Sequence, residues 1–393
     1  MKYDFDTPVS RKETSALKYD ALIPRWGRED LLPLWIADMD FRTPNFIIQA
    51  LEKRLHQGVL GYTKQPKYFF EAIKHWVYHR HQWSIEPEQI VYAPGIVPGI
   101  CTAIECFTKP GDKILIQPPV YHPFSMLICE NNRKVVNNPL RLSNGRYEID
   151  FEHFEKSVKN CKMFILCNPH NPGGRIWSKE ELAQIADICD KYGVLVVSDE
   201  IHADLALPGH KHTCYATVSK KARLHSLTYM AASKAFNVAG LSSSYMITQN
   251  PELLAKYRQF TEGKESAHGH IFAYDALVAA YTQPDGEEWL HAMLEYVQEN
   301  INYVNHRLTT EMPRIKAMQP EASFLIFLDC RDLNLPQDEL VNFFVDGAHL
   351  ALNDGASFGE EGIGWMRLNI GHPRAELKQA LDQLKETYTK YGF

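Results

Sequence analysis

The amino-acid sequence predicts an α/β protein whose main sheet is largely parallel and lies between helices. Short, nearly continuous apolar runs alternate with amphipathic helical stretches through the middle of the chain, which is typical of parallel strands covered on both faces. A helix is predicted at 178–192, where apolar residues from Leu182 to Ile188 recur at helical spacing and Gly193 ends the pattern. The predicted strands are 89–94, 113–118, 162–169, 194–200, 226–233 and 244–249.

The length of 393 residues exceeds one ordinary hydrophobic core, so two domains are expected. After residue 285 a long amphipathic helix leads into the apolar run SFLIFLDC, a helix near 336–347, the run GWMRLNI and a final helix. This order indicates a smaller α+β domain. The expected units are an N-terminal arm with part of the small domain (1–45), a large domain (46–285) and the C-terminal small α+β domain (286–393).

The composition is that of a globular protein with no electrostatic reason to bind nucleic acid or an anionic membrane. Hydrophobic residues make up 45% and charged residues 23%, and the net charge of -6 is modest for this length. No apolar run reaches the roughly 18 residues that a spanning helix needs. The first twenty residues lack the apolar segment of a secretory signal, so export is not expected.

The eight cysteines predict free thiols rather than disulfides or a zinc site. They form no CxxC pair and mostly lie in apolar contexts such as MFILC, so a reducing, cytoplasmic location is expected. The 17 histidines form no HExxH motif, and the pairs His79/His81 and His210/His212 lie only two residues apart. No metal site is therefore predicted.

Polar residues follow four of the predicted strands, at the edge where open parallel sheets bind ligands. Asn168 lies at the end of the third strand, Asp199 at the end of the fourth, and Ser233-Lys234 at the end of the fifth. The first strand ends in the turn Gly95-Ile96-Val97, which opens a helix whose free N–H groups suit a phosphate. Each signal alone has a simpler interpretation: a solvated lysine, a helix cap, or a turn at NPGG. Together, in this order, they favour one ligand site.

These residues lie in motifs that resemble the aspartate aminotransferase superfamily of fold-type I pyridoxal-phosphate enzymes. Within it, the chain is similar to the cystathionine β-lyase/cystalysin group of C–S lyases, the MalY/PatB family. The resemblance covers nearly the whole chain and implies a large domain that binds pyridoxal 5'-phosphate on a mostly parallel, seven-stranded sheet. The motifs are LPLWIADMDF (32–41), APGIVPGI (93–100), KPGDKILIQPPVY (109–121), LCNPHNPGGRIWSKEEL (166–182), VVSDEIHADL (196–205), ASKAFNVAGL (232–241) and SFGEEGIGWMRLNIGHPR (357–374).

The resemblance implies a role for each polar residue around the cofactor ring. Lys234 would form the Schiff base and later take the substrate's Cα proton, while Asp199 would pair with the ring nitrogen. Asn168 would donate to the phenolic oxygen and contact the substrate. His202 would lie near the same oxygen, and a structural histidine under the ring is the alternative. Tyr121 would stack on the ring and, with Lys234 and Asp199, act in catalysis, against the alternative of a core tyrosine.

The phosphate would be held by the backbone N–H groups of Gly95-Ile96-Val97, by Ser233, and by Tyr62 of a neighbouring subunit. Tyr62 lies in GVLGYTKQP, which matches the segment that crosses the dimer interface in this family, so the resemblance implies a homodimer. Many aminotransferases carry an arginine eight residues after the lysine, where this chain has Ser242. The C–S lyase group also tends to lack that arginine.

The substrate's α-carboxylate would be clamped by Arg367, which matches the family's carboxylate-binding arginine. A planar guanidinium binds a carboxylate through two parallel hydrogen bonds. The backbone near Ala37 would contact the same carboxylate. Arg175, in NPGGR, is interpreted as structural.

The predicted reaction is an α,β-elimination from an L-cysteine S-conjugate, with L-cystathionine as the leading candidate, which gives a thiol, pyruvate and ammonia. An aminotransferase would use nearly the same residues, and product analysis separates the two. A third alternative is a regulatory or binding protein on the same fold, which intact Lys234, Asp199 and Arg367 disfavour.

Overall fold

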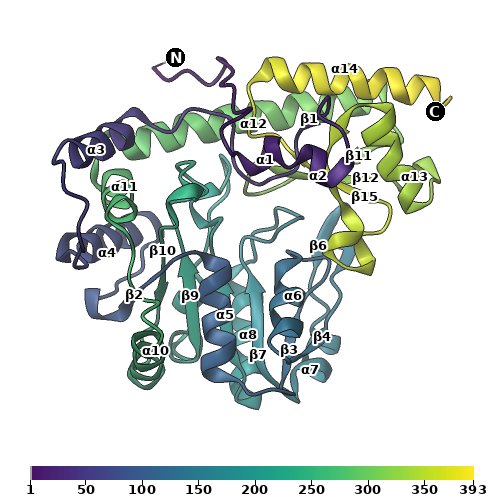
Figure 1. The fold of residues 1–393 in the computed structure, drawn as a ribbon. Coiled ribbons are helices and arrows are strands. Elements are labelled where there is room, and N and C mark those ends of the chain that lie inside the picture. Colours follow the sequence, from purple (N-terminus) through teal and green to yellow (C-terminus); the bar gives the residue numbers. More distant parts are fainter. Residues whose placement is uncertain (1) are drawn as a thin grey trace.

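The structure, a computed structural model that describes residues 2–393, is built around a seven-stranded sheet (Figure 1). Its strands are β2 (Ile90–Ala93), β3 (Lys113–Ile116), β4 (Lys134–Asn137), β7 (Cys161–Cys167), β8 (Leu195–Asp199), β9 (Ser226–Met230) and β10 (Ser244–Ile247). In the order β2-β10-β9-β8-β7-β3-β4, β10 is antiparallel to both neighbours and the other pairs are parallel. The predicted α/β class with a mostly parallel sheet is confirmed.

Six of these strands are the ones that the sequence predicts, and β4 is the one that it misses. The strand lies at the sheet edge, where Lys134 and Asn137 are exposed, so its sequence shows no continuous apolar run. A short antiparallel hairpin of β5 (Arg141–Ser143) and β6 (Arg146–Glu148) follows it.

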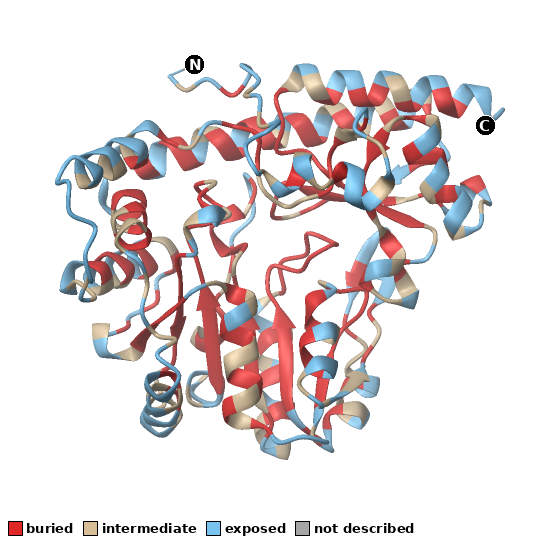
Figure 2. Ribbon diagram, in the orientation of Figure 1, coloured by how far each residue is buried: buried red, intermediate tan, exposed pale blue. Residues whose placement is uncertain are grey.

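Helices cover both faces of the large sheet because its buried strands alternate their side chains between the faces. Ile114 and Ile116 pack with α5 (Ile96–Phe107), α6 (Pro123–Glu130) and α10 (Pro251–Gly263), whereas Leu115 packs with α7 (Phe151–Val158) and α8 (Lys179–Tyr192). Figure 2 shows the strands as the most deeply buried layer. The short α9 (Lys220–Leu224) packs beside α8.

Helix α8 matches the predicted helix at 178–192. Ser178 and Glu181 form a reciprocal capping box at its start. Gly193 ends it in a left-handed conformation, with a φ of 65° that a residue with a Cβ adopts at a cost.

The C-terminal region forms a second, antiparallel sheet in the predicted helix–strand–helix–strand–helix order. The sheet has the order β11-β12-β15-β14 and packs with the long α12 and α14. One apolar cluster runs from these helices to Ile90 and Tyr92 of the large sheet, so the two parts share buried contacts. The bounds are α12 (Asp285–Glu311), β11 (Lys316–Ala317), β12 (Leu325–Asp329), α13 (Gln337–Asn342), β14 (Asn353–Asp354), β15 (Trp365–Asn369) and α14 (Arg374–Lys390), with a π-helical turn at Phe343–Gly347. The domain boundary between 285 and 286 stays a prediction.

The N-terminal segment lies across the C-terminal region before it enters the large sheet's helices (Figure 1). Its β1 (Leu32–Pro33) pairs in parallel with β13 (Leu350–Ala351), and Phe5 packs edge-on against Trp289 of α12 at 5.8 Å. The remaining helices are α1 (Leu17–Asp20), α2 (Leu22–Trp26), α3 (Asn45–Leu55), α4 (Lys67–His81) and α11 (Ile271–Thr282). Among the helices described in residues 2–393, none is long and apolar enough to cross a membrane.

Candidate active site

A cavity of about 720 Å³ opens at the carboxyl ends of the large sheet's strands. It is bounded below by strand ends of the large sheet, and above by the N-terminal arm and β15. The sequence-predicted residues that line it are Ala37, Gly95, Ile96, Val97, Tyr121, Asp199, His202, Ser233, Lys234 and Arg367. The structure therefore gathers residues from positions 37 to 367 into one site.

Lys234 follows β9 and directs its amine into the cavity. Its Nζ donates a hydrogen bond to the carbonyl oxygen of Ala37 at 2.5 Å. Burial lowers the pKa of Lys234 to about 8, an effect that Arg367 reinforces and that Asp38 and Asp199 oppose. A substantial share of neutral, nucleophilic amine is therefore present near pH 8.

Asp199 is a buried carboxylate at the end of β8, between Cys167 of β7 and Tyr229 of β9 in the sheet register. Its Oδ1 accepts a hydrogen bond from the backbone N–H of Ile201 at 3.1 Å. In residues 2–393 no basic side chain forms an ion pair with it. Burial raises the pKa of Asp199 to about 7, so a cationic ligand group placed here would restore its ionised form.

Arg367, on β15, is a buried cation, and no carboxylate in residues 2–393 forms an ion pair with it. Its guanidinium donates to the side-chain oxygens of Asn171 at 3.0 Å and Asn353 at 2.5 Å, and to the Trp35 carbonyl at 2.9 Å. Its Nε is buried without a partner. Burial lowers the pKa of Arg367 to about 10, so an anionic ligand group beside it would favour its charged form.

Three further buried polar atoms near the cavity have no hydrogen-bond partner: Asn168 Oδ1, His202 Nδ1 and Ser243 Oγ. Asn168 does not line the cavity directly, but its backbone N–H donates to the backbone carbonyl of Asp199 at 2.9 Å and its Nδ2 to the Thr213 carbonyl at 3.0 Å. Burial lowers the pKa of His202 to about 3, so its ring is neutral. Buried polar atoms without partners are rare in proteins, and their gathering here indicates a polar ligand.

The first turn of α5 lines the same cavity as Lys234. The helix begins at Ile96 after Gly95, and the first N–H groups of any helix have no intrahelical acceptor. A Cβ on Gly95 would lie 3.2 Å from Cδ of Pro98, so glycine keeps this turn open. Ser233, Ser243 and the residues at the start of the helix line this cavity.

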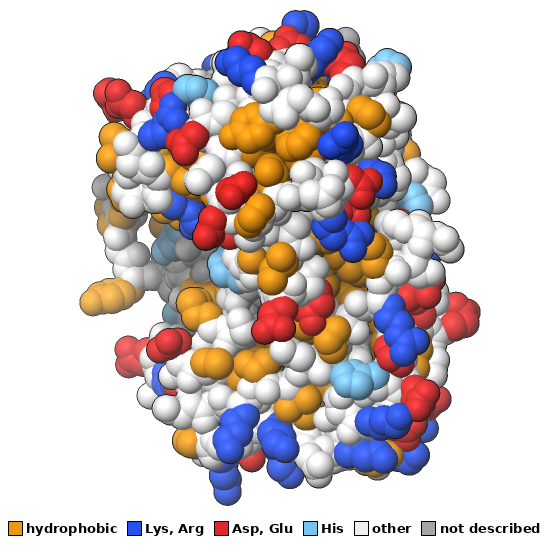
Figure 3. Space-filling view, turned by 90° about the vertical axis from the view of Figure 1, so that its right-hand side faces the viewer, with side chains coloured by type: hydrophobic (Ala, Val, Ile, Leu, Met, Phe, Trp, Pro, Cys, Tyr) orange, Lys and Arg blue, Asp and Glu red, His pale blue; other side chains and the backbone are white. Residues whose placement is uncertain are grey.

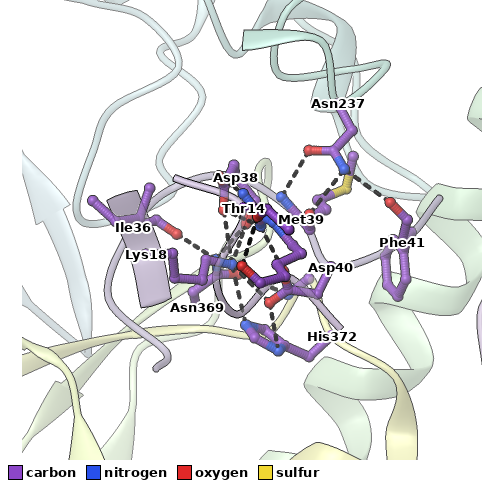
Figure 4. A network of polar contacts seen from close by, with 12 residues as sticks. Thr14, Lys18, Ile36, Asp38, Met39, Asp40, Phe41, Asn237, Asn369 and His372 are labelled. Atoms are coloured by element: carbon purple, nitrogen blue, oxygen red, sulfur yellow. Dashed lines mark hydrogen bonds and ion pairs between the residues drawn. The ribbon is translucent and has the colours of Figure 1, made fainter. Parts of the chain in front are cut away.

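The segment from Trp35 to Met39 is held against the site by a buried polar network (Figure 4). Lys18, fully buried, donates to the Asp38 carbonyl at 2.9 Å and pairs with the carboxylates of Asp38 and Asp40 at 2.8 and 3.0 Å. Asn369 donates to the carbonyl oxygens of Ile36 and Asp38. The carbonyls of this segment contact Lys234 and Arg367, so the network sets the position of both.

Tyr62 lies outside this chain's cavity, on the loop between α3 and α4, and its side chain is fully exposed. Arg175, interpreted as structural from the sequence, pairs with Glu181 at 2.8 Å and Glu321 at 3.1 Å and stays away from the cavity.

The cavity also has walls that the sequence does not reveal. They include Arg25, Trp35, His122, Asn171, Ser243 and Asn353. Asn171 and Trp35 lie within the motifs 166–182 and 32–41, which are the sequence signal for these two partners of Arg367. Arg25 and Asn353 carry no sequence signal.

Comparison with known proteins agrees with this geometry. The family model for aminotransferase class I and II matches residues 29–384. The chain belongs to this aminotransferase family.

Within the family, the chain is 40% identical to the cystathionine beta-lyase PatB of Bacillus subtilis, over 97% of this chain and 99% of the relative. It is 32% identical to the MalY protein of Escherichia coli, over 96% and 97%. Among solved structures, cystalysin of Treponema denticola, which contains a pyridoxal 5'-phosphate cofactor, superposes with a TM-score of 0.96 at 34% identity, over 99% of this chain and all of that one.

The residues of this aminotransferase-family cavity fit pyridoxal phosphate. Asp199 offers a buried carboxylate to a cationic ring nitrogen, and Lys234 offers an amine to an aldehyde. The α5 turn at Gly95 suits a phosphate. Each group is left incomplete by the protein alone, and one molecule with these three features would complete them all.

We predict that Lys18→Met lowers the free energy of unfolding by about 3 kcal/mol, because it removes the fully buried cation of the network and leaves the buried Asp40 carboxylate with Arg11 alone as its lysine or arginine partner. The double variant Lys18→Met/Asp40→Asn should recover part of this loss. The urea midpoint measures both, with the exposed Lys220→Met as a control that leaves it unchanged. Equal midpoints for wild type and Lys18→Met would show that the network does not hold the arm.

Proposed function

We propose that the chain is a pyridoxal-phosphate-dependent C–S β-lyase that cleaves L-cystathionine or a related L-cysteine S-conjugate. The observation that carries the proposal is the joint presence, in one cavity, of a buried carboxylate, a buried guanidinium without an acidic partner and a lysine amine: Asp199, Arg367 and Lys234. The 40% identity to a cystathionine beta-lyase supports the choice of reaction.

The reaction consumes one water and needs no oxidant or second substrate. The Cβ–S bond of the conjugate breaks to give a thiol, and the Cα–N bond breaks to give ammonia. Water supplies the keto oxygen of pyruvate. When bound, the cofactor supplies an electron sink that stabilises negative charge on the substrate's Cα.

The chain's own residues bind the substrate, orient it and move the protons. Arg367 holds the α-carboxylate, with the backbone at Ala37 and the amide of Asn168 beside it. The Lys234 amine takes the Cα proton and, with Tyr121 nearby, supplies a proton to the departing sulfur. Asp199 keeps a proton on the ring nitrogen. A fixed α-carboxylate leaves the Cβ–S bond free to align with the ring.

The remaining predicted residues hold the cofactor. Tyr121 stacks on its ring, and Asn168 and His202 lie on the side of the phenolic oxygen. Gly95-Ile96-Val97 and Ser233 hold the phosphate through N–H and O–H donors, at the turn where α5 begins. Ser242 also lines this part of the cavity, in place of a cation.

The purified protein is predicted to release pyruvate and thiol in equal amounts from L-cystathionine without an added keto acid. Lys234→Ala should lower turnover by about 10³-fold or more, since it removes the amine that moves the proton. Pyruvate and thiol are each measured by a coupled colour assay. Product formation that depends on a keto acid would instead indicate an aminotransferase, and complete inactivity towards amino acids would favour a binding protein.

Covalent uptake of pyridoxal phosphate by cofactor-free protein is predicted to depend on pH through Lys234, whose pKa is lowered to about 8. The neutral amine reacts, so the rate should rise about tenfold per pH unit below that value and level off above it. Borohydride trapping and peptide mapping between pH 6 and 9.5 measure it. Arg367→Met removes a cation that lowers the same pKa, so its plateau should begin at higher pH. A rate that is flat across this range would contradict the assignment.

We infer that the functional unit is a homodimer in which Tyr62 reaches the partner's phosphate site. Six large hydrophobic side chains are exposed along α3, the following loop and the start of α4, at the left edge of Figure 1. Such a concentration of exposed apolar surface is typical of a protein interface. The six are Ile48, Leu55, Val59, Leu60, Tyr62 and Tyr68.

The shared site predicts complementation between two variants that are inactive alone at limiting cofactor, Tyr62→Ala and Lys234→Ala. Mixed dimers hold one site with both residues intact, so random re-association should restore about one quarter of wild-type activity. Mixing Lys234→Ala with the double variant is the control, since it assembles no intact site. Absence of recovery would place Tyr62 in its own subunit's site or outside any site.

The surface charge and the free cysteines bear on the other partners of the protein and on its location in the cell. Acidic and basic side chains are intermixed on the face shown in Figure 3, which supports a small-molecule substrate rather than nucleic acid. All eight cysteines are free thiols and most are buried, which supports a reducing, cytoplasmic location.

A further inference from the structure

The N-terminal arm forms an outer wall of the active-site cavity. The wall consists of Leu17, Ala21, Pro24, Arg25 and Trp35. Figure 1 shows α1 and α2, which supply most of it, above the carboxyl end of the large sheet. Leu17 is largely exposed although it is a large hydrophobic residue, so this wall presents apolar surface to whatever enters the cavity.

Arg25 is the cation in this wall, and it forms no ion pair with an acidic side chain in residues 2–393. Its guanidinium carbon lies 5.0 Å from the ring centre of Trp26 and 4.8 Å from that of Trp35. These two rings meet edge to face at 5.2 Å. The contacts orient the guanidinium through cation–π attraction and leave its N–H donors free for an anion.

Among the described residues that line the cavity, Arg25 is the one charged side chain that has no role in the proposed function. The acidic side chain there is Asp199, and the basic ones are Arg25, Lys234 and Arg367. In the proposed function Asp199 and Lys234 hold the cofactor, and Arg367 holds the α-carboxylate. Burial lowers the pKa of His122, and Arg367 and Arg25 lower it further, so both guanidiniums act on one ring of the cavity wall.

We propose that Arg25 binds a carboxylate at the far end of the leaving group. The inference rests on the proposed lyase function and narrows its substrate class to L-cysteine S-conjugates whose thiol carries a carboxylate, as cystathionine does. The apolar wall formed by Leu17, Ala21 and Pro24 contacts the methylene groups between the sulfur and that carboxylate. Arg25 is then a specificity-determining residue and has no part in proton transfer.

The experiment compares kcat/KM for two matched conjugates, S-(2-carboxyethyl)-L-cysteine and the uncharged S-butyl-L-cysteine, with L-cystathionine as a third substrate. Arg25→Met keeps an unbranched apolar stem between the tryptophans and removes the charge. We expect it to lower kcat/KM about 5- to 20-fold for the two carboxylate-bearing conjugates, mostly through KM, and to leave S-butyl-L-cysteine within about twofold. Arg25→Lys should restore part of the preference.

Arg28→Met is the matched control, because Arg28 follows on the same arm but already pairs with Asp30 and Asp346. It should leave the preference unchanged. Added salt should weaken the wild-type preference and have little effect in Arg25→Met. Equal losses for all conjugates, or no loss, would overturn the assignment of Arg25 while leaving the lyase function intact. Wild-type protein that cleaves none of the conjugates would overturn the lyase function and this inference with it.

Discussion

Two buried charges that the protein does not neutralise govern the chemistry of this fold. Asp199 at the end of β8 and Arg367 on β15 lie in one cavity, and within the described residues neither has an oppositely charged side chain bound to it. Burying an ion without a counter-ion is costly, and here burial shifts the pKa of both groups towards the neutral form. In the proposed function, the cationic ring nitrogen of the cofactor would remove the cost at Asp199, and the carboxylate of the substrate would remove the cost at Arg367.

The unpaired charges in the cavity contrast with the paired charges of the network around Lys18, Asp38 and Asp40. Lys18 forms ion pairs with the carboxylates of Asp38 and Asp40. Arg11 is a second cation that pairs with the same two carboxylates. Burial raises the pKa of Asp38, but Arg11 and Lys18 more than offset it and lower it to about 2, so the carboxylate stays ionised. The network of paired charges thus fixes the backbone of the segment from Trp35 to Met39, whose carbonyls contact Lys234 and Arg367.

The site residues that are predictable from the sequence are those at the ends of strands. The end of a parallel strand lies at the ligand-binding edge of the sheet, whatever the rest of the fold is. Asp199 and Lys234 are such residues, and the structure places both at one cavity. Arg25 and Asn353 enter the same cavity from a short helix and a two-residue strand, and only the tertiary packing brings them there. The edge strand β4 was missed for a related reason, since its half-exposed side chains do not form an apolar run.

The absence of an acidic partner for Arg367 also has a consequence for the base. Burial is the main reason why the pKa of Lys234 is lowered to about 8, and the positive charge of Arg367 lowers it further. In the proposed function, a substrate carboxylate bound to Arg367 would offset that charge, so the pKa of Lys234 would rise and its amine would become a stronger base when there is a Cα proton to remove. An acidic side chain paired permanently with Arg367 would offset the charge at all times, and substrate binding would then no longer change the strength of the base.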